Sequence, residues 1–165
     1  MITALRIVSV LFAGLMTGLL FGDWLGPSFA RSQMPLSGFV QFQQIIHYHY
    51  LKVLPAVSLV ALLAPITWLV LVRHRRREFR ILFLATLSLA IGFAITFIYN
   101  VPVNDVLETW DYHSPPLNAR ELWQPWESAH VVRTIFWGVG FVLEILALAL
   151  HAGTQIPQRE IIEST

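Results

Sequence analysis

The sequence contains no cysteine, and only 13% of its 165 residues are charged. The absence of cysteine excludes disulfides, thiolate metal sites and thiol redox chemistry. An ordinary soluble domain carries about 25% charged residues, so this chain has too little polar surface to face water on all sides. It also lacks a basic stripe with interleaved aromatic residues, and we therefore expect no nucleic acid partner.

The hydrophobic residues, 56% of the chain, gather in four runs at about 7–22, 53–72, 81–99 and 134–150. A helix needs about 20 mostly apolar residues to cross a bilayer. The sequence therefore predicts an all-α fold. We expect a single domain, 1–165, built as an integral membrane antiparallel four-helix bundle with the lipid bilayer as its first partner.

The orientation of this bundle follows from the positions of lysine and arginine, which favour the cytoplasmic side. Five arginines lie between the second and third runs, and with Arg6 and Arg159 that side holds seven of the eleven basic residues. An even number of spans places both termini on the same side. We expect a multi-pass protein of the cell membrane with N- and C-termini in the cytoplasm.

The first run carries a small-xxx-small pattern, Gly14, Gly18 and Gly22, which lets helix backbones approach closely. It predicts tight packing of the first helix, or a homo-oligomer contact through these glycines. An alternative is that the run belongs to a signal peptide, with Ser28-Phe29-Ala30 as the small-residue cleavage site. Asp23, Trp24 and Pro27 separate the run from that site and favour a retained span.

Two non-cytoplasmic segments, about 23–44 and 100–130, are predicted to be structured loops. The second is rich in tryptophan, which anchors polypeptide at a membrane interface and favours order. This segment begins with Asn100, and Asn104 follows four residues later, with Pro102 between the two asparagines. Two carboxamides four residues apart would share a face if the helix continued, and each can orient a polar ligand. Alternatively, the asparagine and proline simply end the helix.

The fourth run begins with Trp126, His130 and Arg133, spaced four and three residues apart and hence on one helical face. This face combines an imidazole, a permanent cation and an aromatic wall. It could bind an anionic or enolate-like oxygen through Arg133 while His130 exchanges a proton. The structural alternative is that Arg133 reaches the lipid headgroups and His130 is solvated at the helix end.

His47 and Tyr50 share a face at the start of the second run. A histidine-bound copper or iron site would need the fold to bring His47 to His130, because no two histidines have the spacing that places two ligands on one helix turn. Glu144 lies inside the fourth run, where an ionisable residue is costly. The sequence offers it no basic partner, so its role stays open.

The sequence NVPVN at residues 100–104, a tryptophan-rich segment and then W-x-x-x-H-x-x-R at residues 126–133 resemble the anthrone oxygenase-like family of small four-helix membrane proteins. The resemblance implies an oxygenase that uses O2 to convert an anthrone to an anthraquinone. It points to Asn100, Asn104, Trp126, His130 and Arg133.

On this basis, we expect a pocket at the non-cytoplasmic end that holds a small lipophilic substrate. His130 would act as base, Arg133 as enolate clamp and His47 as a second base or a metal ligand. Asn100, Asn104, Trp126 and Tyr50 would bind the substrate. Enolate oxidation can proceed without an organic cofactor, so the cofactor is either none or a histidine-bound copper or iron. The alternative is a non-enzymatic membrane component that binds a lipid or a partner protein.

Overall fold

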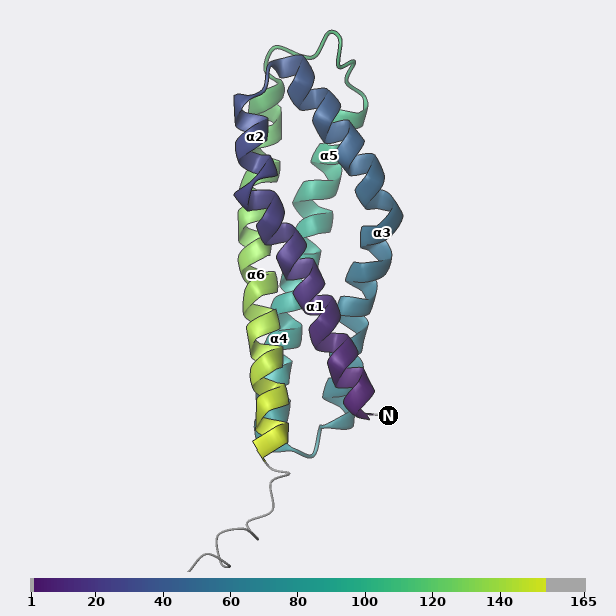
Figure 1. Ribbon diagram of the computed structural model, residues 1–165, viewed down its shortest axis with the longest axis vertical. Coiled ribbons are helices and arrows are strands. Elements are labelled where there is room, and N and C mark those ends of the chain that lie inside the picture. The colour runs from purple at the N-terminus through teal and green to yellow at the C-terminus, as the bar shows by residue number, and fades with distance from the viewer. Residues whose placement is uncertain (1, 154–165) are drawn as a thin grey trace, which may run out of the picture.

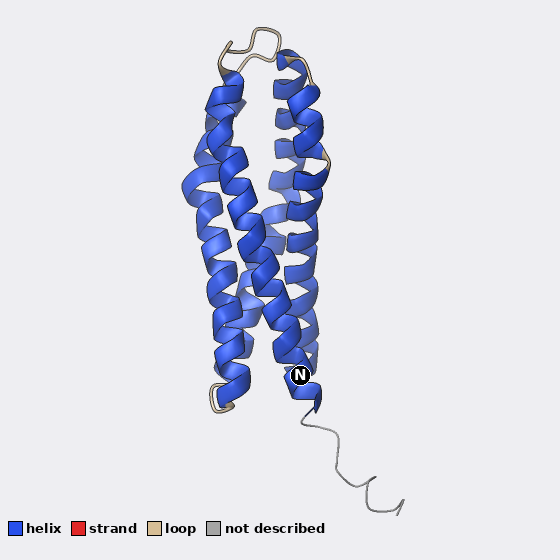
Figure 2. Ribbon diagram, turned by 90° about the vertical axis from the view of Figure 1, so that its left-hand side faces the viewer, coloured by secondary structure: helices blue, strands red, loops and turns tan. Residues whose placement is uncertain are grey.

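The computed structural model describes residues 2–153, and this part of the chain contains helices and turns but no strand (Figure 2). Two short helical segments and one π-helical turn connect or extend the long helices. In chain order the elements are α1 (Ile2–Leu25), α2 (Pro27–Gln33), α3 (Leu36–Leu71), α4 (Arg76–Ile95), η1 (Thr96–Asn100, π-helical), α5 (Val101–Glu108) and α6 (Ala119–Gly153). The all-α prediction is confirmed.

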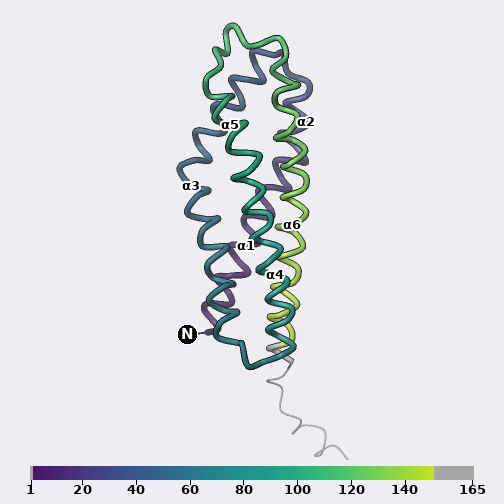
Figure 3. The backbone as a smooth tube through the Cα atoms, turned by 180° about the vertical axis from the view of Figure 1, so that it is seen from behind, coloured from purple at the N-terminus to yellow at the C-terminus, as the bar shows by residue number. Residues whose placement is uncertain are grey.

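Four helical rods are long and apolar enough to cross a membrane, namely 2–33, 36–71, 76–108 and 119–150. Consecutive rods run in opposite directions (Figure 1). We call the end that carries the 72–75 turn and the N-terminus the lower end, and the end that carries the 109–118 turn the upper end. The view from behind shows the lower turn between α3 and α4 (Figure 3).

The helices extend well beyond the apolar runs. The 36 residues of α3 make a rod of about 54 Å at 1.5 Å per residue, whereas a bilayer core is about 30 Å thick. The segments 23–44 and 100–130 are therefore mostly helical and not the loops that the sequence predicted. Only residues 109–118 form a long turn there. A hydropathy pattern locates the apolar part of a helix. It does not locate the ends of that helix when polar residues extend it.

Pro102 does not end the third rod, because the turn before it is π-helical. Proline lacks an N–H and its ring clashes with the carbonyl four residues back, which an α-helix interior cannot accommodate cheaply. Here the N–H of Val101 donates to the carbonyl of Thr96, five residues back, and α5 continues from that turn. The helix-ending interpretation of this motif was wrong, and both asparagines remain on a helical rod.

Close packing of α4 against α6 depends on glycines that the sequence pattern did not single out. A Cβ on Gly92 would lie 2.7 Å from Trp137, and one on Gly140 would lie 2.5 Å from Leu89. In α1, Gly14 packs against Phe141 of α6 in the same way, at 2.9 Å. Gly18 and Gly22 meet nothing within 4 Å, so an oligomer contact through them stays a prediction.

A cluster of buried polar residues lies toward the lower end. Arg6 is 0% exposed and donates to Glu78 at 2.7 Å, and Trp68 Nε1 donates to the same Glu78 oxygen at 3.0 Å. Glu144, also buried, accepts a hydrogen bond from Ser9 Oγ at 3.1 Å. These contacts tie α1 to α4 and α6, which gives both Arg6 and Glu144 structural partners in neighbouring helices.

Candidate functional site

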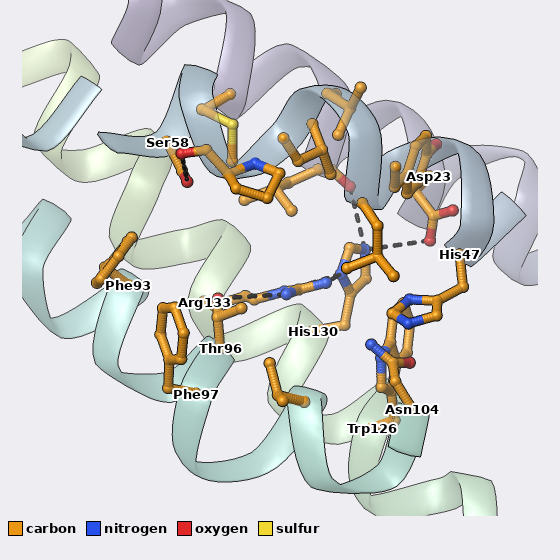
Figure 4. A pocket seen from close by; sticks show the side chains of 18 of the residues that line it. Asp23, His47, Ser58, Phe93, Thr96, Phe97, Asn104, Trp126, His130 and Arg133 are labelled. Carbon is orange, nitrogen blue, oxygen red and sulfur yellow. Dashed lines mark hydrogen bonds and ion pairs between the residues drawn. The ribbon is translucent and has the colours of Figure 1, made fainter. Parts of the chain in front are cut away.

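A cavity of about 210 Å³ lies between α1, α3, the α4–α5 rod and α6 (Figure 4). A buried water needs only about 10–15 Å³ of such space, so the cavity has room for a multi-atom ligand. Most of the wall is apolar or aromatic. The apolar and aromatic residues of this wall include Met16, Leu19, Leu20, Leu51, Leu54, Pro55, Phe93, Phe97, Val101 and Trp137.

Six of the seven residues predicted from the sequence line this cavity: His47, Tyr50, Asn104, Trp126, His130 and Arg133. They come from α3, α5 and α6, so the fold brings together segments far apart in the chain. Asn100 is the exception. It is fully buried behind the wall, where its Nδ2 donates to the carbonyl of Trp126 at 3.1 Å, and it thus links the third rod to α6.

The three residues on the α6 face contact one another directly. The ring of Trp126 stacks on His130, with centroids 4.8 Å apart and planes at 13°. Arg133 donates from Nε and Nη2 to Nδ1 of His130, at 3.2 and 2.9 Å, and its guanidinium lies 5.2 Å from the Trp126 ring. Neither His130, at 0% exposure, nor Arg133, at 9%, reaches solvent as the structural alternative required.

The partners of His130 define its tautomer. Because Nδ1 accepts from Arg133, the ring proton belongs on Nε2. That nitrogen lies 3.1 Å from the carbonyl oxygen of Leu20 and 3.4 Å from Oδ2 of Asp23. A carboxylate on one side of an imidazole, with the reacting nitrogen on the other, orients the ring and stabilises its protonated form.

Arg133 has no carboxylate partner among residues 2–153. Its remaining side-chain hydrogen bond runs from Nη1 to Thr96 Oγ1 at 3.2 Å. Thr96 opens the π-helical turn η1, and its hydroxyl also donates to the carbonyl of Gly92. The π-helical turn that accommodates Pro102 therefore also supplies the hydroxyl beside Arg133.

A network of charged residues holds Asp23 in place above the cavity. Arg31, from the short helix α2, contacts both oxygens of Asp23 at 2.8 and 3.1 Å and reaches Glu127 of α6 at 3.1 Å. Ser28 Oγ and Trp123 Nε1 donate to the same Glu127 carboxylate. Arg31 is 2% exposed, so this network is a buried brace between α1, α2 and α6.

Sequence reasoning missed Asp23, Thr96 and Gln43 as cavity residues. Asp23 follows an apolar run, where an acid usually marks the end of a span, and its partner His130 is remote in sequence. The only local signal was Arg31, eight residues later and on the same side of the predicted membrane. Thr96 gave no signal, because a threonine in an apolar helix is ordinary.

The predicted metal site of His47 and His130 has no third ligand among the described residues. Among the described residues, no group of three or more His, Cys, Asp or Glu side chains is arranged to hold a metal ion. His47 and His130 line the same cavity, but both ring nitrogens of His130 already face protein partners. Binding a metal there would first require Arg133 to release Nδ1.

Comparisons with known proteins agree with the motifs at residues 100–133. No curated protein and no solved structure matches the chain. The family described as anthrone oxygenase matches residues 42–143, which is more than half of the chain and includes most of α3, the α4–α5 rod and the cavity face of α6. The chain therefore belongs to the anthrone oxygenase family.

Proposed function

We propose that this protein is a membrane-embedded oxygenase that oxidises a lipophilic aromatic substrate of the anthrone type with O2. The observation that carries the proposal is Arg133, a buried guanidinium that opens on an apolar cavity without a carboxylate partner among residues 2–153. Such a cation is arranged to bind an oxyanion that forms during a reaction, and such preorganised donors are a large term in catalysis.

The cavity walls support a lipophilic, flat ligand that arrives from the bilayer. Leu51 of α3 and Phe97 of η1 line the cavity and are also 56% exposed on the outer surface of the bundle. We therefore place the mouth of the cavity between these two residues, on an apolar flank of the bundle and not at a polar end. Phe93, Phe97 and Trp137 supply aromatic faces inside.

In the proposed first step the substrate carbonyl oxygen replaces Nδ1 of His130 as the acceptor of the hydrogen bonds from Arg133. The freed Nδ1 of His130 removes a proton from the ring carbon opposite the carbonyl, and the resulting enolate oxygen stays bound to Arg133. The imidazolium that forms keeps its Nε2–H on Leu20 O and Asp23. The residue that loses its hydrogen bond on substrate binding thus becomes the base.

The enolate then supplies the electrons that reduce O2. Transfer of electrons from the carbanion carbon to O2 and protonation by His130 give a carbon-bound hydroperoxide. Loss of the remaining hydrogen on that carbon, with cleavage of the O–O bond, gives the second carbonyl and water. The balance is anthrone plus O2 to anthraquinone plus H2O, and no further oxidant or organic cofactor is needed.

The placement in the membrane is part of the proposal. The five arginines between positions 73 and 80 favour a cytoplasmic lower end, which puts both termini in the cytoplasm and the cavity in the opposite half of an antiparallel four-span bundle. A reporter fused after residue 165 should be active only when it is of a kind that functions in the cytoplasm. The opposite result would invert the proposed topology.

The test is turnover by the detergent-purified protein under ¹⁸O2. We expect anthrone-dependent O2 uptake with one anthraquinone per O2, and one ¹⁸O atom in each anthraquinone formed above the spontaneous rate. Metal analysis and chelator treatment of the same sample would distinguish cofactor-free oxidation from a copper or iron enzyme. Binding of anthrone without O2 uptake would contradict the oxygenase and identify a non-enzymatic binding protein.

A further inference from the structure

The polar residues of the cavity fall into two sets with different hydrogen bonding. Arg133, His130, Thr96 and Asp23 bond one another or the backbone. In the second set, three atoms are buried without any hydrogen-bond partner among the described residues: Gln43 Oε1, Asn104 Oδ1 and Trp126 Nε1. All three side chains line the cavity.

The second set gathers at one end of the cavity. Gln43 and His47 lie one turn apart on α3, Asn104 lies on α5 and Trp126 on α6. Figure 4 shows His47, Asn104 and Trp126 near one another and away from Phe93 and Ser58. The imidazole of His47 has no hydrogen-bond partner within the described chain either. Three helices therefore direct polar groups at the same space.

Buried polar groups normally have hydrogen-bond partners, because an unsatisfied donor or acceptor costs about 1–3 kcal/mol. Gln43 is 3% and Trp126 is 6% exposed, so bulk water does not satisfy them. A molecule in the cavity, either a ligand or water, can supply the missing partners.

The chemistry of the set restricts what this molecule presents. The two carboxamides offer donors and acceptors, the indole offers a donor, and the imidazole adds a ring nitrogen. None of the four side chains carries a carboxylate, an ammonium or a guanidinium. A hydroxyl group, which both donates and accepts but has no charge, satisfies such a set, whereas a carboxylate or a phosphate would find no cation among these four side chains.

We propose that Gln43, His47, Asn104 and Trp126 form a second subsite, which binds an uncharged hydroxyl of the substrate other than the oxygen held by Arg133. This inference rests on the proposed function, because it takes the first subsite to hold the carbonyl or enolate oxygen. The ligand is then a flat apolar molecule that carries a hydroxyl in addition to the carbonyl or enolate oxygen. Gln43 becomes a specificity-determining residue.

The test uses two non-reactive probes of nearly equal size, 2-(hydroxymethyl)anthraquinone and 2-ethylanthraquinone. They differ in one OH against one CH3, and neither can undergo the proposed oxidation. Dissociation constants for the detergent-purified protein can be measured by quenching of tryptophan fluorescence. We expect the hydroxymethyl probe to bind about tenfold more tightly, the size of one well-formed buried hydrogen bond.

Gln43→Leu and Asn104→Leu should each reduce this preference to about twofold or less. The matched control is Gln41→Leu, an exposed glutamine on the same helix, which should keep the full preference. A melting temperature gives the second readout. Because the two amides have no protein partners, their leucine variants should melt no lower than wild type without ligand. A purely structural role predicts a lower melting temperature.

Equal affinities of the two probes for wild type would overturn the proposal, as would binding of neither probe or a full preference in both leucine variants. Those results would mean that the amides hold water only. The outcome is separable from that of the proposed function. A clear hydroxyl preference without O2 uptake would leave this subsite standing and contradict the oxygenase, and O2 uptake without the preference would do the reverse.

Discussion

Arg6 and Arg133 are both buried beside a tryptophan, but their hydrogen-bond partners differ. Arg6, toward the lower end, donates to Glu78 at 2.7 Å and lies 5.5 Å from the Trp68 ring. Arg133, in the upper half, also faces a tryptophan, but its hydrogen bonds go to an imidazole and a hydroxyl. Arg6 has a carboxylate partner in the chain, whereas the described residues offer Arg133 none.

The comparison shows that burial of a charge is not by itself a sign of function. A guanidinium with its own carboxylate connects helices, and its charge is compensated before any ligand arrives. A guanidinium without one, beside a cavity, has charge left for a ligand. Ionisable residues in a membrane are functional candidates by default. A buried arginine is a functional candidate when it has no carboxylate partner, and a structural one when it has.

We expect the largest effect on activity, when Arg133 is replaced. Arg133→Met should lower kcat/KM for anthrone oxidation by roughly 10²–10³-fold or more, because the enolate loses its oxyanion donor. Arg133→Lys should also be impaired, since an ammonium cannot contact His130 and Thr96 as a planar fork does. Anthraquinone formation followed by absorbance measures both. A fully active Arg133→Met would refute the site assignment.

The next effect is on stability, which we expect to fall when Arg6 is replaced but not when Arg133 is replaced. Arg6→Met leaves buried Glu78 with only the longer ion pair to the exposed Arg75, at 3.5 Å, and should lower the free energy of unfolding by up to about 3–5 kcal/mol. Arg133→Met removes a charge that has no carboxylate partner, so its unfolding free energy should stay the same or rise. Thermal unfolding in detergent checks both variants. Equal destabilisation of the two would remove the distinction drawn here.

Asp23→Asn tests how the upper network supports the base. It removes the carboxylate beside Nε2 of His130, and we expect kcat to fall on the order of 10- to 100-fold, a part of what a positioned base contributes, with little change in KM. The matched control is Glu127→Gln, which removes the other carboxylate of Arg31 without a contact to His130. Its kcat should remain within about twofold of wild type. Equal losses would show that Asp23 acts only through Arg31.

The smallest effects concern the glycines behind the site. Gly92→Ala places a Cβ 2.7 Å from Trp137 and should cost about 1–3 kcal/mol by overpacking. Gly18→Ala meets nothing within 4 Å and should be neutral or stabilise by up to about 1 kcal/mol, as expected for a helix interior. Chemical unfolding of the two variants gives the comparison. A destabilised Gly18→Ala would instead indicate an oligomer contact at this glycine.

The sequence predicted the parts of this molecule that depend on local pattern. Apolar runs gave the four long helices, and the four-and-three spacing predicted the shared face of Trp126, His130 and Arg133. It gave wrong helix ends, because polar extensions of a helix look like loops, and it did not predict the π-helical turn before Pro102.

Long-range pairing explains what the sequence could not give. Arg6 looked like an ordinary cytoplasmic marker, yet it is buried against Glu78 from another helix. Asp23 looked like the end of a span, and only the fold brings it to His130. Whether a charge is paired depends on which helices are neighbours, and no periodicity in a single helix contains that information.

The most direct test of the account is to mix anthrone with the purified protein in the absence of O2. Without O2 the reaction stops at the enolate, whose absorption lies at longer wavelength than that of the neutral ketone. The account predicts a stoichiometric enolate band with wild type and Arg6→Met, and none with Arg133→Met. An equal band in the Arg133→Met variant, or no band in wild type, would contradict the claim that Arg133 binds the oxyanion.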